Sequence, residues 1–386
     1  MKIVHIANFY GPKSGGIRTT LHQIGSGYIS KGHDFTYVVP GSALFCEETP
    51  HGRKITVPSF ILPFSGGYRI IRSNSDLKKL LVTLTPDIIE VSDRFTLSSI
   101  GIWAEKRQIS AVVFSHETLS GLVKTYLPFS IQKIVNWHNR RLASRFKHVV
   151  TTTEFAAKEF QQISVRNIVR IPLGVDLQHF HPNKRNSELR YTLLKGADVL
   201  LLHCGRMSPE KKPELSIQTL RELRSRGINA HLIYVGNGPM YSKLRKISAD
   251  LPVTFLGYVA NREKLAEILA SADISIAPGP IETFCLAALE SIASGTPVVA
   301  SNTSAVGEFL LLNSKEQVGA VANGDPVDFA NAVQQMLQIR NADTSLSMRA
   351  HQQAENYPWS STVAMLLNLH GEKDEIRKSK HRLRAA

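Results

Sequence analysis

The chain has 386 residues, a length typical of about two to three domains. Hydrophobic residues make up 43% and charged residues 20%, which provides enough apolar side chains for sizeable cores. This composition excludes a disordered chain, a collagen and a small disulfide-stapled scaffold. No apolar run approaches the roughly 18 residues of a membrane-spanning helix, and the apolar stretch at the N-terminus is too short for a signal peptide. Cys46, Cys204 and Cys285 are widely spaced, which predicts neither disulfides nor structural zinc and favours a reducing cytoplasm.

Positive charge is concentrated in the N-terminal half of the chain. The net charge is +14; residues 1–170 hold 22 basic and 11 acidic side chains, whereas residues 171–370 hold 18 of each. The remaining excess lies in the last sixteen residues. A basic half predicts a polyanionic partner, which could be nucleic acid, an anionic membrane surface or a phosphate-bearing substrate.

Strand-like and helix-like segments alternate along both halves of the chain. The expected strands are residues 2–9, 35–39, 87–91, 111–115 and 148–153, then 199–205, 231–236, 253–257, 274–278 and 297–301. A polar, Pro-containing segment at 171–197 separates the two series. This order predicts an α/β fold with two doubly wound, Rossmann-like parallel sheets. We expect domains at 1–170 and 171–356, and at 357–386 a helix that crosses back to the first domain, followed by a basic tail.

Ligands of such sheets bind outside the carboxyl ends of the strands, so we expect the site in the crevice between the two domains. Gly15 and Gly16 follow the first strand and open a helix, where backbone N–H groups can approach a phosphate or simply form a tight turn. Arg206 and Lys211 follow the strand at 199–205, where two cations can converge on a diphosphate. Gly236 lies in a Gly-Asn-Gly-Pro turn that lacks the third glycine of a dinucleotide fingerprint.

The segment from Pro278 to Glu290 is the most informative. We expect Glu282 in the loop after the strand at 274–278 and Glu290 two turns into the next helix, roughly 80° around its axis. One carboxylate can then bind sugar hydroxyls, while the N–H groups of Phe284, Cys285 and Leu286 favour phosphate. The alternative interpretation is that Glu282 caps the helix and that Glu290 is a solvated helix residue.

Two further features belong to the N-terminal half. His116 ends the strand at 111–115 and is expected to face the crevice, as a donor to a sugar hydroxyl or to developing charge, or as a structural histidine. Basic residues interleave with apolar ones between Gly66 and Leu84, which is typical of a basic amphipathic helix on an anionic membrane or of an ordinary surface helix. These basic residues are Arg69, Arg72, Lys78 and Lys79.

The glycine loop, GRMSPEKK, VGNGP and the Glu-x7-Glu segment, in this order over residues 1–370, resemble the retaining GT-B glycosyltransferases of family 4. Within this family, stretches such as ANFYGPKSGGIRT, VSDRFTLSSIG, SHETL and APGPIETFCLAALES are similar to the members that transfer mannose from GDP-mannose to phosphatidylinositol mannosides. The resemblance implies an α-mannosyltransferase of the hexosyltransferase class. Its acceptor would be an anionic phosphoinositide-type glycolipid, reached by peripheral contact with the inner face of the plasma membrane.

The same resemblance implies roles for the residues above. Arg206 and Lys211 would bind the donor diphosphate. This loop reads Glu-Lys-Lys where many relatives have Glu-Lys-Gly, which leaves Lys211 or Lys212 as the phosphate ligand, and the spacing favours Lys211. Glu282 would hold the mannose hydroxyls and Glu290 the ribose hydroxyls. The glycines of the first loop would close on the diphosphate, and His116 would lie beside the transferred sugar. The chain from Tyr10 to Arg18 would lie near the acceptor.

Several alternatives stay open. The chain lacks an Asp-x-Asp motif, so no metal-dependent GT-A chemistry and no required cofactor are expected, although a divalent ion could assist. Another donor, such as a UDP-sugar, or another acceptor, either a different glycolipid or a soluble polyol, would suit the same fold. A GT-B-fold epimerase and an NAD-dependent dehydrogenase are more remote. A nucleic-acid-binding protein is disfavoured because no zinc-finger spacing or aromatic RNA-binding motif is present, so no nucleic-acid partner is expected.

Overall fold

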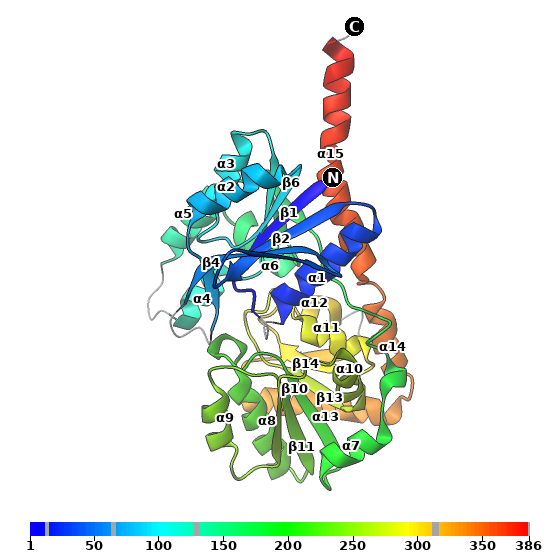
Figure 1. Ribbon diagram of the computed structural model, residues 1–386. Helices are drawn as coiled ribbons and strands as arrows, with labels where there is room; N and C mark the ends of the chain where they lie inside the picture. The colour runs from blue at the N-terminus through cyan, green and yellow to red at the C-terminus, as the bar shows by residue number, and fades with distance from the viewer. Residues whose placement is uncertain (12–14, 63–66, 127–130, 311–315, 385–386) are drawn as a thin grey trace.

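The computed structural model describes residues 1–11, 15–62, 67–126, 131–310 and 316–384. Within these residues the chain forms a nine-stranded and a six-stranded sheet, each flanked by helices, and Figure 1 shows the first sheet above the second. Residues 12–14 of the predicted glycine loop lie outside the described residues. The two α/β domains predicted from the alternation of strands and helices are confirmed.

The first sheet is built around β1, whose apolar residues are buried on both faces. Its strands are β1 (Lys2–Ala7), β2 (Asp34–Gly41), β3 (Phe45–Thr49), β4 (Gly52–Ile61), β5 (Arg69–Ile71), β6 (Ile88–Ser92), β7 (Ser110–Ser115), β8 (His148–Thr151) and β9 (Ile168–Arg170). The order is β3-β4-β2-β1-β6-β7-β8-β9, with β5 against β4. The pairs β3–β4 and β4–β5 are antiparallel, so the fully parallel sheet that we expected is wrong at this edge. There the connections are too short for the helical crossover that parallel strands require.

Helices cover both faces of the first sheet (Figure 1). They are α1 (Gly16–Ser30), α2 (Asn74–Leu84), α3 (Ser99–Glu105), α4 (Leu119–Tyr126), α5 (Gln132–Ala143) and α6 (Glu154–Gln161). The side chain of Ser73 accepts a hydrogen bond from the Asp76 N–H and so fixes where α2 begins. Thr153 caps α6 in the same way, through the N–H of Ala156.

The second sheet is parallel throughout, with the order β12-β11-β10-β13-β14-β15. Its strands are β10 (Val199–Cys204), β11 (Ala230–Val235), β12 (Val253–Gly257), β13 (Ile274–Ala277), β14 (Val298–Ser301) and β15 (Gly319–Ala322). Its helices are η1 (Pro182–Lys184), α7 (Ser187–Leu194), η2 (Pro209–Lys211), α8 (Pro213–Ser225), α9 (Tyr241–Ile247), α10 (Arg262–Ser271), α11 (Leu286–Ala293), α12 (Gly307–Leu310), α13 (Pro326–Ala342) and α14 (Leu346–Ala354). The order reverses between β10 and β13, and ligands of such sheets bind at this switch point.

The last helix, α15 (Trp359–Arg384), leaves the second domain and runs along the first (Figure 1). It packs against α1, where a Cβ atom on Gly27 would lie only 2.4 Å from a methyl group of Val363. A side chain at Gly27 would therefore separate the two helices. Val363, Leu366 and Leu369 are buried in the contact, so α15 contributes to the core of the first domain.

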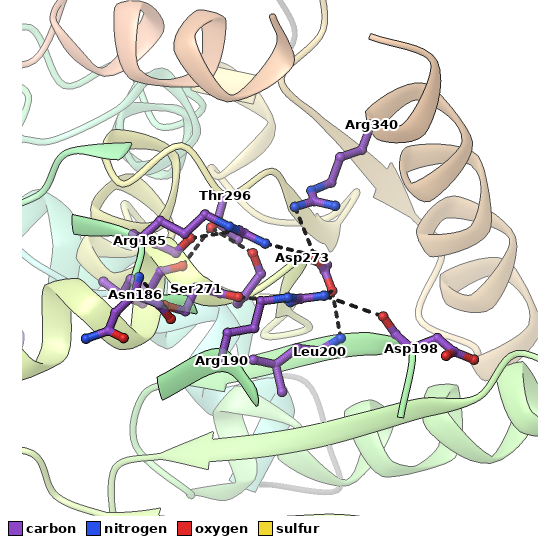
Figure 2. A network of polar contacts seen from close by, with 12 residues as sticks. Arg185, Asn186, Arg190, Asp198, Leu200, Ser271, Asp273, Thr296 and Arg340 are labelled. Carbon is purple, nitrogen blue, oxygen red and sulfur yellow. Dashed lines mark hydrogen bonds and ion pairs between the residues drawn. The ribbon is translucent and has the colours of Figure 1, made fainter. Parts of the chain in front are cut away.

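A buried carboxylate ties the second domain together on the side of its sheet where the strands begin. Asp273 precedes β13, is 2% exposed and pairs with Arg190 at 2.8 Å, with Arg340 at 3.0 Å and with Arg185 at 3.9 Å. The carboxylate also accepts a hydrogen bond from the N–H of Leu200 in β10 at 2.8 Å. Figure 2 shows the three arginines converging on this one side chain. A single acid therefore links β10, β13, α13 and the segment that includes α7.

Candidate active site

Loops that follow the carboxyl ends of both sheets meet and form hydrogen bonds with one another. The hydroxyl groups of Thr152 and Thr153, after β8, donate to the carbonyl of Thr283, after β13, at 3.0 and 2.8 Å. The Thr283 hydroxyl in turn donates to the carbonyl of His116, after β7. These contacts bring together the strand ends at which the sequence predicts a ligand site.

Lys211 and Glu282 form the central contact of this region. Lys211 ends η2, and its Nζ lies 2.6 Å from Oε1 of Glu282, whose side chain is 10% exposed. Burial lowers the pKa of Lys211, but the ion pair with Glu282 outweighs it and raises that pKa above its ordinary value. Gly279 leaves room for the pair, since a Cβ atom there would lie 3.0 Å from Oε1 of Glu282. The site thus contains a fixed cation beside a carboxylate, a pairing that the sequence did not predict.

Arg206 follows β10 and contacts a residue of the other domain. Its guanidinium carbon lies 4.1 Å from the centre of the Tyr68 ring, a cation–π distance that bridges the two domains. Gly236 lies beneath this loop with φ +130°, and a Cβ atom there would approach the Gly205 carbonyl to 2.0 Å. The glycine at position 236 is therefore required by backbone packing. Its predicted contact with a donor stays a prediction.

The N-terminus of α11 lies directly after Glu282. Cys285 precedes the helix with φ +67°, Phe284 is buried, and Leu286 is the first helical residue. Burial and the neighbouring Glu282 raise the pKa of the Cys285 thiol to about 12, so the cysteine is a neutral, unreactive neighbour of the site. Glu290 lies about one turn into α11, because the helix begins later than the sequence suggested, and the two turns that we expected are wrong.

Glu290 is a candidate ligand for a hydroxyl-bearing group because its environment is unusual. Burial, reinforced by Asp176, raises the pKa of its carboxyl to about 7, and Arg262 opposes this shift. The carboxylate can therefore exchange its proton near neutral pH, and its charged form gains from a ligand that donates hydrogen bonds.

We expect the stability of the protein to depend on pH through Glu290. The unfolded chain releases this proton near pH 4.5, whereas the folded protein keeps it up to pH about 7, so the folded state binds more protons in that window. The unfolding free energy of the wild type should fall by on the order of 2 kcal/mol, relative to Glu290→Gln, as the pH rises from 4 to 8. Urea denaturation of both proteins across this range measures the difference. Equal pH slopes would contradict the assignment.

His116 lies at the end of β7, as the sequence predicts. Its Nε2 is 2.8 Å from the hydroxyl of Ser92 at the end of the neighbouring strand β6. Its ring stacks on Phe114, with a centroid distance of 5.8 Å. Burial lowers the pKa of His116 to about 4, so the imidazole is neutral at pH 7. A neutral imidazole is suited to binding a hydroxyl rather than a charged group.

The residues predicted near the acceptor lie around the start of α1. A Cβ atom on Gly15 or Gly16 would meet nothing within 4 Å among the described residues, so the backbone there is open to approach. The hydroxyl of Tyr10 lies 2.9 Å from Nε2 of His22. Arg18 donates a hydrogen bond to the hydroxyl of Tyr258 in the second domain. The start of α1 therefore lies against both domains.

The four basic residues predicted to share one amphipathic helix do not do so. Arg69 lies in β5, Arg72 precedes the Ser73 cap, and only Lys78 and Lys79 belong to α2. The pleated pairing of β4 with residues 69–71 overrides the helical spacing, and the cap fixes the helix start at Asn74. Lys79 is 3.5 Å from Asp76, which offsets its charge.

The parts of the chain that the structure describes hold neither a cluster of metal-ligating side chains nor a membrane-spanning helix. No group of three or more His, Cys, Asp or Glu side chains there could hold a metal ion. Likewise, none of the described helices combines the length and the hydropathy needed to cross a bilayer.

Sequence reasoning missed three side chains that complete the site: Tyr68 under Arg206, Thr283 between the domains, and Arg262 near Glu290. Tyr68 lies next to Arg69, and Thr283 lies inside the segment from Pro278 to Glu290, so each adjoins residues that the sequence singles out. Arg262 begins α10 in a segment with no distinguishing pattern, and only the fold places it near Glu290.

The sequence is similar to those of known glycosyltransferases. Residues 198–339 match the model described as glycosyl transferases group 1, and residues 14–179 match glycosyltransferase family 4. The chain is 40% identical over 369 residues to the GDP-mannose-dependent alpha-(1-6)-phosphatidylinositol dimannoside mannosyltransferase of Mycobacterium tuberculosis, and the match covers 95% of each chain. It is 26% identical over 305 residues, 78% of this chain and 72% of the relative, to a GDP-mannose-dependent alpha-mannosyltransferase of Corynebacterium glutamicum.

Solved structures give the same result for the fold. A sucrose-phosphate synthase from Thermosynechococcus elongatus superposes with a TM-score of 0.77 at 20% identity, covering 97% of this chain and 100% of that one. The lipopolysaccharide glycosyltransferase WaaG superposes with a TM-score of 0.71 at 17% identity, covering 95% of this chain and 99% of that one. Both support the predicted GT-B architecture. Together with the sequence relatives, they show that the chain belongs to the family 4, or group 1, glycosyltransferases.

Proposed function

We propose that this glycosyltransferase moves mannose from GDP-mannose to a phosphatidylinositol mannoside, with retention of configuration. The observation that carries the proposal is the 40% identity to a phosphatidylinositol dimannoside mannosyltransferase along 95% of both chains, combined with the Lys211–Glu282 pair at the switch point of the second sheet. The basic N-terminal domain supports an acceptor that carries a lipid phosphate, since opposite charge draws such a substrate to the surface.

The site residues suit the chemistry of glycosyl transfer. Its transition state is oxocarbenium-like, and negative charge grows on the departing diphosphate. Lys211 and Arg206 supply fixed positive charge where that diphosphate leaves, and the N–H groups at the start of α11 add to it. Glu282 holds Lys211 in place and accepts hydrogen bonds from the sugar hydroxyls. The departing phosphate takes the proton of the acceptor hydroxyl, so that no protein nucleophile is required.

We further propose that the reaction needs no resident cofactor. Lys211 and Arg206 provide the charge that a metal ion supplies in other enzymes. Transfer should therefore continue after dialysis against a chelator, and a divalent ion should raise the rate only modestly.

A radiolabel transfer assay tests donor and acceptor together. GDP-mannose and UDP-sugars are offered to membranes that contain phosphatidylinositol mannosides, and the glycolipids are separated by polarity. Transfer from GDP-mannose into a more polar glycolipid is the expected result. Transfer only from a UDP-sugar, or only to a soluble polyol, would keep the family and overturn the substrate.

Membrane contact is proposed at α5, on the inner face of the plasma membrane. Residues 118–153 contain six Lys or Arg and no Asp or Glu. On α5 the side chains of Ile134 and Trp137 are 59% and 57% exposed. Arg141 lies 5.3 Å from the Trp137 ring centre. An exposed Trp beside basic side chains is typical of helices that lie in the headgroup region of an anionic bilayer.

Charge reversal distinguishes α5 from α2. Exchanging Lys133, Arg140 and Arg141 for Glu should lower binding to phosphatidylglycerol vesicles by more than about 10²-fold at low salt, because each basic residue near the surface contributes about 1 kcal/mol and each Glu adds repulsion. The matched control reverses Lys78 and Lys79 on α2 and should have a smaller effect. Co-sedimentation with vesicles measures both. If the α2 variant loses as much binding as the α5 variant, the assignment to α5 is wrong.

A further inference from the structure

A chain of buried hydrogen bonds leads from His116 into the core of the first domain. Nε2 of His116 lies 2.8 Å from the Ser92 hydroxyl, which lies 2.7 Å from Nε2 of His5. Nδ1 of His5 lies 2.7 Å from a carboxylate oxygen of Glu90. His5 and Glu90 are fully buried and Ser92 is 3% exposed, so water does not compete along this path.

Glu90 is held as a charged acceptor at the inner end of the chain. Its second oxygen, Oε1, accepts from the Tyr28 hydroxyl at 2.6 Å and contacts Nε2 of His370 at 2.8 Å. Burial raises the pKa of Glu90, but its hydrogen bonds with His370 and His5 outweigh burial and hold that pKa well below its usual range. An ionised carboxylate can only accept, so the nitrogen of each histidine that faces it must carry a proton.

The direction of the remaining bonds follows from that acceptor. The ionised Glu90 requires the His5 proton on Nδ1, and with that single proton on the ring, Nε2 keeps a lone pair and accepts a hydrogen bond from the Ser92 hydroxyl. Ser92 then has only lone pairs left for His116, so Nε2 of His116 must donate to it. The other nitrogen of His116, Nδ1, is left without a proton. It has no hydrogen-bond partner among the described residues, and it is not fully buried.

We propose that Glu90, His5 and Ser92 form a positioning chain that fixes the proton of His116 on Nε2, so that Nδ1 accepts a hydrogen bond from a hydroxyl of the transferred sugar. The assignment of that hydroxyl rests on the proposed function. It also changes the role of His116 at the site, from a donor, which the sequence suggested, to an acceptor. Second-sphere partners of this kind commonly fix the tautomer and the orientation of a functional imidazole.

The chain extends to the last helix of the protein. His370 lies on α15, is 2% exposed, and its Nδ1 is buried without a partner in the described structure. The contact of His370 with Glu90 therefore makes α15 part of the support of His116, 254 positions earlier in the sequence. The helix that crosses between the domains thereby contributes to the active site without touching substrate.

Ser92→Ala is the sharpest test, because it cuts the chain next to His116 and leaves the bonds of Glu90 intact. We expect kcat to fall by about 10-fold, the scale of losing a second-sphere hydrogen bond. Ser92→Thr keeps the hydroxyl and should restore most of the rate. Tyr28→Phe is the matched control: it removes a bond to the same carboxylate without interrupting the path, and its kcat should stay within about twofold of the wild type.

Two readouts separate positioning from a general loss of structure. In the His116→Ala background, Ser92→Ala should cause no further fall in kcat, because the two changes remove one pathway. Nitrogen-15 spectra of the histidine-labelled, ligand-free enzyme, with His116 assigned by its absence from the variant, should show the proton on Nε2. In Ser92→Ala that signal should move toward a mixture of tautomers.

The outcomes are distinct. A proton on Nδ1 of His116 in the wild type, or an additive loss in the double variant, would overturn the positioning chain. Absence of transfer from GDP-mannose by the wild type would overturn the proposed function alone, since the spectra need no substrate and decide the chain by themselves.

Discussion

Lys211→Ala should lower kcat for mannosyl transfer by about 10²- to 10³-fold, the range found when one charged partner of a developing anion is removed. Lys211 is the cation that Glu282 holds at 2.6 Å beside the start of α11, so its loss removes fixed charge from the leaving diphosphate. Binding of the donor in the ground state should weaken less than kcat, because the charge on the leaving group grows only in the transition state. Steady-state kinetics with GDP-mannose measures both quantities.

Lys212→Ala is the matched control for this experiment. Lys212 is the next residue in the chain and is exposed, with φ +44°. The sequence alone allows either lysine to bind phosphate, whereas the structure places only Lys211 on Glu282. A larger loss in Lys212→Ala than in Lys211→Ala would contradict the assignment of the phosphate ligand.

Asp273→Asn should destabilise the second domain by about 3–5 kcal/mol, the cost of removing one partner from a buried ion pair. The amide keeps the shape of the carboxylate and can still accept from the Leu200 N–H, so the change removes mainly charge. Arg185, Arg190 and Arg340 would then face one another without a counter-ion. Urea denaturation followed by circular dichroism measures the loss.

Asp198→Asn is the control for Asp273→Asn. Asp198 lies in the same network, but it is exposed and contributes only its backbone carbonyl, which accepts from Arg190. Its replacement should change the unfolding free energy by less than about 0.5 kcal/mol. If Asp273→Asn proved equally mild, the arginines would be held by their backbone contacts and not by the acid.

The architecture could be predicted because it depends on short-range patterns. Runs such as VLLLHC and HLIYV are buried on both faces, which only central parallel strands require, and the structure has strands at Val199–Cys204 and Ala230–Val235. The residues after such strands are forced toward one edge of the sheet, so Lys211 and Glu282 could be assigned to one site from their positions alone.

Contacts between distant segments could not be predicted in the same way. His5 and Glu90 are polar residues inside two apolar runs, which is a visible anomaly, but their pairing depends on the register of β1 against β6. The link from Glu90 to His370 spans 280 positions and exists only because α15 returns to the first domain. The prediction that Arg69 lies in a helix failed for a different reason. Its spacing from the neighbouring apolar residues fits a helix, but pairing with β4 decides its conformation.

The return of α15 also has a consequence for how the protein is made. Domains generally fold as they leave the ribosome, the N-terminal one first. Here the first domain is not complete when its own strands have been synthesised: Gly27 on α1 still lacks the Val363 side chain that packs on it, and Glu90 still lacks His370. The domain translated first is therefore the last to be finished, and the second domain must be made, and can fold, before its neighbour closes its core.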